Sequence, residues 1–276
     1  MNARNPIGVF DSGYGGLTVL KEVVKMLPGY DYLYLGDNAR APYGPRSFET
    51  VYRYTWQCVE WFFKQGCPLV ILACNTASAK ALRTIQQKDL PKKYPDKRVL
   101  GVIRPTTELI GNYSHTKSVG ILATSGTVIS QSYPIEIAHL FPGVKVYQEA
   151  CPMWVPLVEN NEYDGEGADY FIKKNLDNLL KQSGEIDTIL LACTHYPLLK
   201  NKLDKFLPSS IKILTQGEIV AAGTKDYLHS HPEIETKLSR NRERVFYTTD
   251  STQDFDSHAR VFYGEEIASK HADLDE

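Results

Sequence analysis

Long hydrophobic stretches are missing from this sequence: no apolar run approaches the roughly 20 residues that a membrane-spanning helix needs. A strong excess of one charge is missing too, because the 276 residues carry a formal net charge of −2. This balance gives no general attraction to nucleic acid or to an anionic membrane, so we expect neither as a partner. The short polar start, residues 1–6, is not typical of a secretory signal peptide, and we expect the protein to be cytoplasmic.

Cysteine is scarce, and its odd number and wide spacing do not suggest a disulfide framework. The pair Cys193 and His195 offers two metal ligands, but no C-x-x-C or second pair completes a zinc set. We therefore expect no metal site. Two of the cysteines are predicted to be core residues and one stays undecided, with a structural role favoured; these are Cys58, Cys67 and Cys151.

A dinucleotide or phosphate loop is also missing. The segment Ser12-Gly13-Tyr14-Gly15-Gly16 is rich in glycine, but it fits neither G-x-G-x-x-G nor a loop ending in Gly-Lys-Ser/Thr. We expect no cofactor. The glycines are interpreted either as a close approach of the backbone to a small carboxylate or as a tight turn from strand to helix.

Short β-rich apolar runs alternate with helix-period segments along almost the whole chain. This alternation predicts α/β architecture with mainly parallel sheets. Ser47 is a plausible N-cap, and Ile129, Tyr133, Ile137 and Leu140 form one of the helical stripes. The predicted strands are 7–10, 31–35, 69–73, 99–103, 119–123, 145–147, 188–192, 211–214 and 245–248.

A weak internal repeat suggests two related lobes. Residues 7–12 resemble residues 119–124, each being a strand followed by a small or hydroxyl residue and a glycine-containing turn. Residues 69–74 resemble residues 188–193, and both segments end in Ala-Cys. The two landmarks recur in the same order at similar spacing, which favours duplication over chance similarity between buried strands.

The repeat places Cys74 and Cys193 where a buried strand ends and the next segment begins. Ligands of open α/β sheets bind outside the carboxyl ends of the strands. A cysteine after an apolar strand is often only a small buried hydrophobic residue. Two cysteines at matching positions of two lobes instead indicate a pair of functional thiols.

Four segments of the chain form a recognisable set: 11–20 (DSGYGGLTVL), 36–44 (GDNARAPYG), 73–78 (ACNTAS) and 192–199 (ACTHYPLL). Together with weaker matches at 123–127 and 151–159, they resemble the glutamate racemase family of the aspartate/glutamate racemase superfamily. They occur in family order. Arg104 is a departure, because the family usually has a less charged and more glycine-rich stretch there.

The resemblance implies two flavodoxin-like lobes related by a pseudo-two-fold axis, with the active site in the cleft between them. The first lobe would comprise residues 1–98 plus 212–276, so that the C-terminal segment completes it, and the second residues 99–211. A homodimer is also implied.

The implied reaction is cofactor-independent interconversion of L- and D-glutamate, which supplies D-glutamate for peptidoglycan synthesis. The implied catalytic residues are Cys74, Cys193, Asp11 and His195. The implied substrate-binding residues are Asp11, Ser12, Pro42, Tyr43, Gly44, Asn75, Thr76, Thr124, Glu159, Thr194 and His195. Two alternatives stay open: racemisation of aspartate or another acidic amino acid, and a non-catalytic amino-acid-binding protein.

Overall fold

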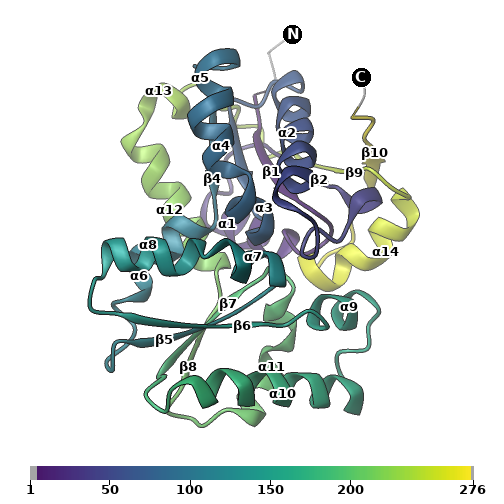
Figure 1. The fold of residues 1–276 in the computed structure, drawn as a ribbon. Coiled ribbons are helices and arrows are strands. Elements are labelled where there is room, and N and C mark those ends of the chain that lie inside the picture. Colours follow the sequence, from purple (N-terminus) through teal and green to yellow (C-terminus); the bar gives the residue numbers. More distant parts are fainter. Residues whose placement is uncertain (1–4, 275–276) are drawn as a thin grey trace.

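Within residues 5–274, which the computed structural model describes, the chain forms two parallel β-sheets, one in each lobe (Figure 1). The strand order is β10-β9-β2-β1-β3-β4 in the first sheet and β6-β5-β7-β8 in the second. All strand pairings in both sheets are parallel. The predicted α/β class is confirmed.

The first sheet contains β1 (Ile7–Asp11), β2 (Tyr32–Gly36), β3 (Leu69–Leu72), β4 (Arg98–Gly101), β9 (Arg244–Thr248) and β10 (Ser269–His271). The helical segments of this part are α1 (Leu17–Met26), η1 (Asn38–Arg40), α2 (Phe48–Lys64), α3 (Asn75–Lys80), α4 (Leu82–Thr84), η2 (Ile85–Asp89), α5 (Leu90–Lys93), α12 (Gly217–Ser230), α13 (Pro232–Glu235) and α14 (Thr252–Tyr263).

The second sheet contains β5 (Ser118–Ala123), β6 (Lys145–Ala150), β7 (Thr188–Ala192) and β8 (Lys212–Leu214). Its helical segments are α6 (Ile103–Ile110), α7 (Ser125–Ser130), α8 (Ser132–Leu140), α9 (Trp154–Glu159), α10 (Glu166–Gln182), η3 (Tyr196–Leu199) and α11 (Lys200–Phe206). The strands next to the site, β1, β3, β5 and β7, are buried along their whole length, as parallel strands covered on both faces must be.

The two lobes have the same local topology, which agrees with the internal repeat. The order β2-β1-β3-β4 of the first sheet matches the order β6-β5-β7-β8 of the second. The packing matches as well. A Cβ added at Gly8 on β1 would lie 2.7 Å from Phe62 on α2, and one added at Gly120 on β5 would lie 2.8 Å from Leu179 on α10. Helix α2 follows β2 and α10 follows β6, so the two helices are equivalent. Each glycine lets its helix pack closely against the central strand of its sheet.

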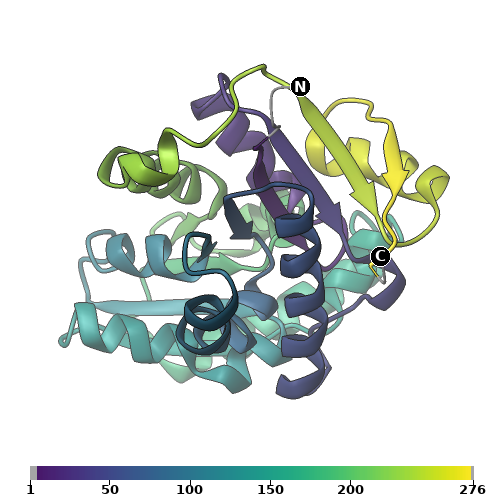
Figure 2. The same cartoon turned by 90° about the horizontal axis from the view of Figure 1, so that it is seen from above.

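The C-terminal segment completes the first sheet, as expected. Strand β9 pairs with β2, and Figure 2 shows this yellow segment beside the purple N-terminal strands. The stripe Phe255, Ala259 and Phe262 of α14 is buried. Strand β10 was not predicted, because Ser269-Lys270-His271 is a polar edge strand without apolar alternation.

The predicted lobe boundary 98/99 falls inside β4, and the predicted boundary 211/212 falls directly before β8. Strand β4 pairs with β3 and therefore belongs to the first sheet, whereas β8 pairs with β7. The predicted strand 99–103 is also too long, since α6 begins at Ile103. We propose that the chain leaves the first lobe after Gly101 and returns to it after Leu214.

The predicted helical stripe of Ile129, Tyr133, Ile137 and Leu140 is only partly right. Tyr133 and Ile137 on α8 are fully buried, but Ile129 on α7 is 69% exposed. Gln131 has a left-handed backbone with φ of 55° and separates α7 from α8. The two short helices therefore point their side chains differently, and one continuous stripe does not form.

Candidate active site

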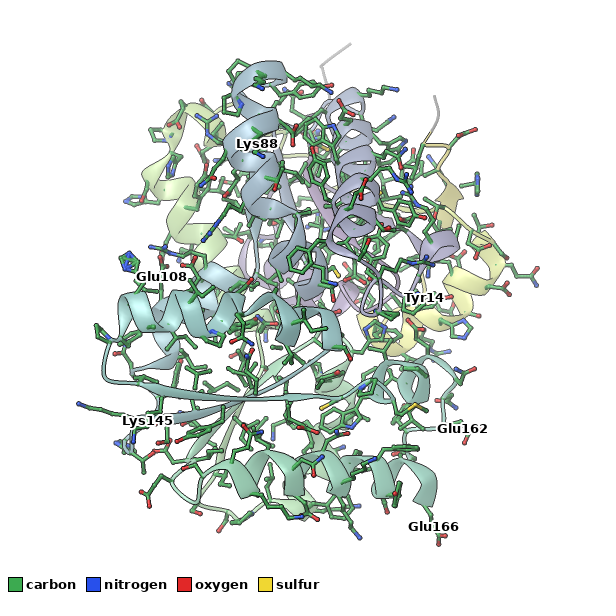
Figure 3. The ribbon with its side chains drawn as sticks, viewed as in Figure 1. Tyr14, Lys88, Glu108, Lys145, Glu162 and Glu166 are labelled. Atoms are coloured by element: carbon green, nitrogen blue, oxygen red, sulfur yellow. The ribbon has the colours of Figure 1, made fainter. Side chains whose placement is uncertain are left out.

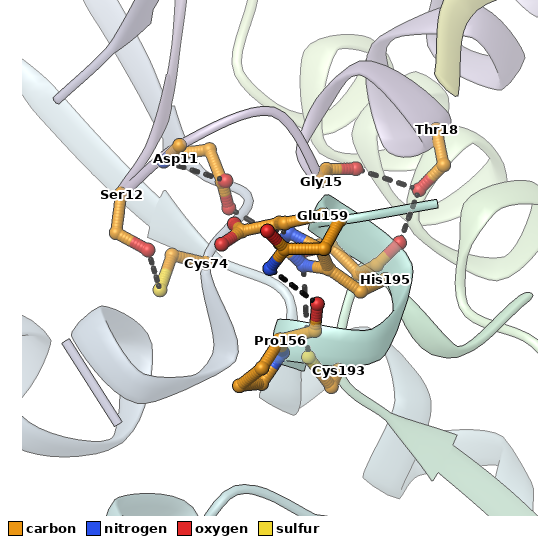
Figure 4. A network of polar contacts seen from close by, with 12 residues as sticks. Asp11, Ser12, Gly15, Thr18, Cys74, Pro156, Glu159, Cys193 and His195 are labelled. Carbon is orange, nitrogen blue, oxygen red and sulfur yellow. Dashed lines mark hydrogen bonds and ion pairs between the residues drawn. The ribbon is translucent and has the colours of Figure 1, made fainter. Parts of the chain in front are cut away.

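The carboxyl ends of strands from both lobes meet at the junction between the lobes (Figure 4). Ser12 follows β1, Cys74 follows β3, and Cys193 and Thr194 follow β7. The Thr194 hydroxyl donates to Asp11 at 3.4 Å, and the Thr18 hydroxyl donates to the Thr194 carbonyl at 3.1 Å. Cys193 contacts this network through His195, and Cys74 contacts the hydroxyl of Ser12, the residue that follows Asp11.

Cys74 is the N-cap residue of α3, and its sulfur has two hydrogen-bond partners. The backbone N–H of Ala77 donates to the sulfur, and the Ser12 hydroxyl contacts it, both at 3.4 Å. Burial raises the pKa of the Cys74 thiol to about 12, and the charge of Asp11 acts in the same direction. The bonds from Ser12 and Ala77 oppose this rise, because they stabilise the thiolate. Cys74 is therefore a protonated thiol at neutral pH, with donors placed for its ionised form.

Cys193 has a different partner, the imidazole of His195. The sulfur lies 4.0 Å from Nδ1, and Nε2 on the other side of the ring lies 2.9 Å from the Glu159 carboxylate. Burial acts to lower the pKa of His195, but the hydrogen bonds and charges of Cys193 and Glu159 outweigh it and raise the pKa to about 10. The positive charge of this imidazolium lies beside the Cys193 sulfur. Glu159, on α9, lies at the site as the resemblance implied.

Asp11 lies between these two groups and is fully buried. Its Oδ1 accepts from the backbone N–H of Gly13 at 3.0 Å. Burial raises the pKa of Asp11, while the positive charge of His195 lowers it. The carboxylate therefore links the end of β1 to the turn that carries the second thiol.

The glycine-rich segment closely approaches the other lobe. A Cβ at Gly15 would lie 2.2 Å from Thr194 Oγ1 and 2.5 Å from His195 Nδ1. No side chain larger than hydrogen fits there without moving the second thiol's turn. The segment is the turn from β1 to α1, as the second interpretation expects, and the approach to a small carboxylate stays a prediction.

Tyr14, labelled in Figure 3 near the boundary of the lobes, stacks on α14. Its ring centroid lies 5.0 Å from His258 and 5.5 Å from Phe255. The edge of His195 contacts Phe262 of the same helix, with the centroids 5.2 Å apart. Aromatic side chains of the C-terminal helix thus cover this side of the site.

Thr76 and Thr124 face each other across the lobes, with hydroxyl oxygens 2.9 Å apart. Gly44 packs against Thr124, because a Cβ there would lie 3.3 Å from the threonine Cβ. Tyr43 is buried, and its hydroxyl donates to Asp37. The turn that contains Pro42 therefore reaches the site through its backbone, and the Tyr43 hydroxyl points to a supporting carboxylate.

The side chain of Asn75 is buried and already bonded at both ends. Its amide nitrogen donates to Gln216 at 2.6 Å, and its oxygen accepts from the Tyr133 hydroxyl at 2.6 Å. Gln216 was not identified from the sequence. It lies two residues beyond β8, so the strand-end rule that singled out both cysteines also points to it.

The remaining cysteines are buried, and Cys58 accepts from the Arg40 guanidinium at 3.4 Å. The predicted core placement of Cys58 and Cys67 is confirmed. Cys151 is fully buried, and its carbonyl accepts from the Tyr196 hydroxyl. Arg104 is exposed on α6 and pairs with two acidic side chains, Glu108 and Glu136.

Both candidate thiols are nearly buried, with 5% of Cys74 and 6% of Cys193 exposed. Such a site excludes water and strengthens the electrostatic effects of its fixed donors and charges. Within residues 5–274, no three His, Cys, Asp or Glu side chains form a group suited to hold a metal ion. No helix in the same part of the chain is long and apolar enough to cross a bilayer.

The chain belongs to the Asp/Glu/Hydantoin racemase family, whose model matches residues 7–221. A glutamate racemase from Streptococcus gordonii is 36% identical over 272 residues, which cover 98% of this chain and 99% of that protein. A solved glutamate racemase isoform from Bacillus anthracis is 34% identical, with a TM-score of 0.89 and 99% of both chains covered. The Francisella tularensis glutamate racemase, solved in complex with D-glutamate, is 31% identical, with a TM-score of 0.87 and again 99% coverage of each chain.

Proposed function

We propose that this protein interconverts L- and D-glutamate without a cofactor, using Cys74 and Cys193 as two bases on opposite faces of the substrate. One observation carries the proposal. Two thiols lie at equivalent strand ends of duplicated lobes, and each has its own partner for holding or releasing a proton. Two groups that approach one carbon from opposite sides invert it without turning the substrate.

In the direction from L- to D-glutamate, the Cys193 thiolate removes the α-proton. His195 stabilises the thiolate before the transfer, and Glu159 holds the imidazolium in place. The electron pair of the broken C–H bond stays on the substrate, and Cys193 becomes a neutral thiol. The raised pKa of His195 keeps a positive charge beside the sulfur that takes the proton of the L-isomer.

The Cys74 thiol then donates its proton to the opposite face, and the product is D-glutamate with a Cys74 thiolate left behind. The Ser12 hydroxyl and the Ala77 N–H stabilise this thiolate. In the reverse direction the Cys74 thiolate removes the proton from D-glutamate. The raised pKa of Cys74, about 12, makes it a stronger base and narrows the gap to the weakly acidic α-proton, each unit of which costs about 1.4 kcal/mol.

The substrate is held by groups from both lobes. We assign the α-carboxylate and ammonium to Asp11, Ser12, Thr76, Thr194 and the backbone at Asn75. The turn of Pro42, Tyr43 and Gly44, together with Thr124, lines the space for the side-chain carboxylate. These preorganised donors must stabilise the developing negative charge.

The biological role that we propose is supply of D-glutamate for peptidoglycan, in the cytoplasm and as a homodimer. Aspartate is the second candidate substrate, since the paired thiols suit any small acidic amino acid. The sequence identity to glutamate racemases over almost the full chain favours glutamate.

A chiral assay of both substrates, without added cofactor, tests the proposal. We expect each glutamate isomer to reach the racemic mixture and aspartate to stay largely unconverted. Faster conversion of aspartate would replace the substrate assignment. Binding of glutamate with no loss of optical activity would instead establish a binding protein.

A further inference from the structure

A closed ring of three hydrogen bonds lies directly beside Cys74. Asn75 Nδ2 donates to Gln216 Oε1 at 2.6 Å, Gln216 Nε2 donates to the Tyr133 hydroxyl at 2.8 Å, and this hydroxyl donates to Asn75 Oδ1 at 2.6 Å. All three side chains are buried. Because each member both donates and accepts within the ring, the loss of one leaves buried polar atoms of the other two without partners.

The direction of the ring is fixed from outside. The Thr106 hydroxyl donates to the Val102 carbonyl at 2.9 Å, so its oxygen is left to accept from Gln216 Nε2 at 3.0 Å. Gln216 Nε2 also lies 3.3 Å from the Val102 carbonyl, which accepts hydrogen bonds and never donates them. The amide of Gln216 therefore has one orientation, and this orientation sets the direction of every bond in the ring.

The ring lies where the chain passes between the lobes. Val102 belongs to the outgoing passage, between β4 and α6, and Gln216 belongs to the return passage, between β8 and α12. Asn75 comes from α3 beside the first sheet, and Tyr133 from α8 beside the second. The Gln216 side chain thus bonds both passages to one helix of each lobe.

We propose that Gln216 is a positioning residue for the Cys74 thiol. Asn75 follows Cys74 directly, in the first turn of a helix whose N-cap is Cys74 itself. By holding the Asn75 side chain against both passages and α8, Gln216 fixes the first turn of α3, and with it the thiol, relative to the second lobe. The hydrogen bonds of Cys193 and His195 run to each other, to Thr194 and to Glu159, and Gln216 makes none of these contacts.

The inference rests on the proposed roles of the two thiols, and it predicts an effect on one face of the substrate. In Gln216→Leu, kcat/KM for glutamate should fall roughly tenfold to a hundredfold in both directions, since displacement of a catalytic group by about 1 Å costs up to that much. Equal losses are required because the two isomers are equally stable. The slowed step, however, is proton transfer at Cys74 alone.

Deuterium at Cα distinguishes the two faces. With α-deuterated D-glutamate, Cys74 removes the deuteron, so the isotope effect on kcat/KM should rise in the variant. With α-deuterated L-glutamate, Cys193 removes the deuteron in a step that is no longer limiting, so the isotope effect should fall. A general loss of stability or packing moves both isotope effects alike.

Two further variants complete the experiment. Thr106→Val keeps the ring but removes the acceptor that orients the Gln216 amide, and it should change both isotope effects in the same directions by less. Thr224→Val removes a buried hydroxyl from the helix that follows Gln216, where it bonds only the Val220 carbonyl, and it should leave both isotope effects unchanged. If Gln216→Leu changes the two isotope effects alike, or changes neither, the inference is overturned. If the unmodified protein neither racemises glutamate nor exchanges its α-hydrogen in deuterated water, the two-thiol mechanism fails first.

Discussion

Replacing Gly15 by alanine tests how closely the first lobe controls the second thiol. The added Cβ would lie 2.2 Å from Thr194 Oγ1 and 2.5 Å from His195 Nδ1, about 1 Å closer than ordinary contact. Rotation of the threonine hydroxyl relieves only the first clash, because the carbon Cε1 of His195 also lies 2.7 Å from the new methyl. The imidazole must therefore move away from its present position beside Cys193.

A displacement of this size costs up to about a hundredfold in rate when it separates a base from its partner. We expect kcat of Gly15→Ala to fall by roughly that factor, and the free energy of unfolding to fall by about 1–3 kcal/mol through overpacking. The matched control is Gly29→Ala, since a Cβ at Gly29 has nothing within 4 Å.

The assay is chiral quantification of glutamate, together with thermal unfolding of both variants. Gly29→Ala should keep the activity of the unmodified protein. Near-normal activity of Gly15→Ala would refute the reasoning, because it would mean either that the clash is relieved at no cost or that His195 does not act at Cys193.

Three other predictions concern the proton-handling groups and the fold. Glu159→Gln removes the negative charge that helps to raise the pKa of His195, so the imidazolium is lost at lower pH. The alkaline limb of the pH–kcat/KM profile should therefore move to lower pH, and an unmoved limb would contradict the pairing of Glu159 with His195. Cys74→Ala should abolish racemisation but leave slow exchange of the α-proton of L-glutamate with deuterated water, as followed by NMR; Cys67→Ala is the buried control, and racemisation by the Cys74 variant would exclude the two-base mechanism. Burial acts to raise the pKa of Asp187, but hydrogen bonds that include two backbone N–H groups lower it to about 2. The ionised form therefore stabilises the fold above about pH 4, and this contribution is lost as the pH falls toward 2. Asp187→Asn should therefore lower the free energy of unfolding by about 1 kcal/mol at neutral pH, and the difference from the unmodified protein should shrink in acid. Denaturant unfolding at neutral and at acid pH measures this difference. A pH-independent difference would count against the carboxylate's role.

Much of the fold follows from local patterns. The strands β1, β3, β5 and β7 are short, apolar and buried on both faces, so period and length alone identified them. Ser47 caps α2 as expected, since its side chain accepts from the Thr50 N–H. The internal repeat indicated two lobes, because strands with similar sequences pack against equivalent helices and so need similar small and apolar residues.

Other features depend on tertiary contacts that a single sequence does not encode locally. Strand β10 exists because β9 offers a free edge, and its own residues are polar. The lobe boundaries that we propose differ by a few residues from the predicted ones, because a strand pattern does not say which sheet the strand joins. The break between α7 and α8 lies at Gln131, where neither glycine nor proline is present to predict it.

The candidate site shows the same division. The strand-end rule found Cys74 and Cys193, but other hydrogen bonds of the site join distant segments. His195 bonds Glu159, which lies 36 positions away along the chain, and Asn75 bonds Gln216, which lies 141 positions away. Such pairs become visible only when the two lobes are folded together.

Deuterium labelling in the early phase of the reaction is the decisive measurement. L-Glutamate is incubated with the protein in deuterated water without any cofactor. Before the reverse reaction becomes appreciable, both isomers are separated, and the deuterium content of each is measured by mass spectrometry. Two thiols on opposite faces predict D-glutamate that carries one deuterium at Cα, beside remaining L-glutamate that still carries protium. Deuterium in both isomers to the same extent, or protium retained in the product, would contradict them.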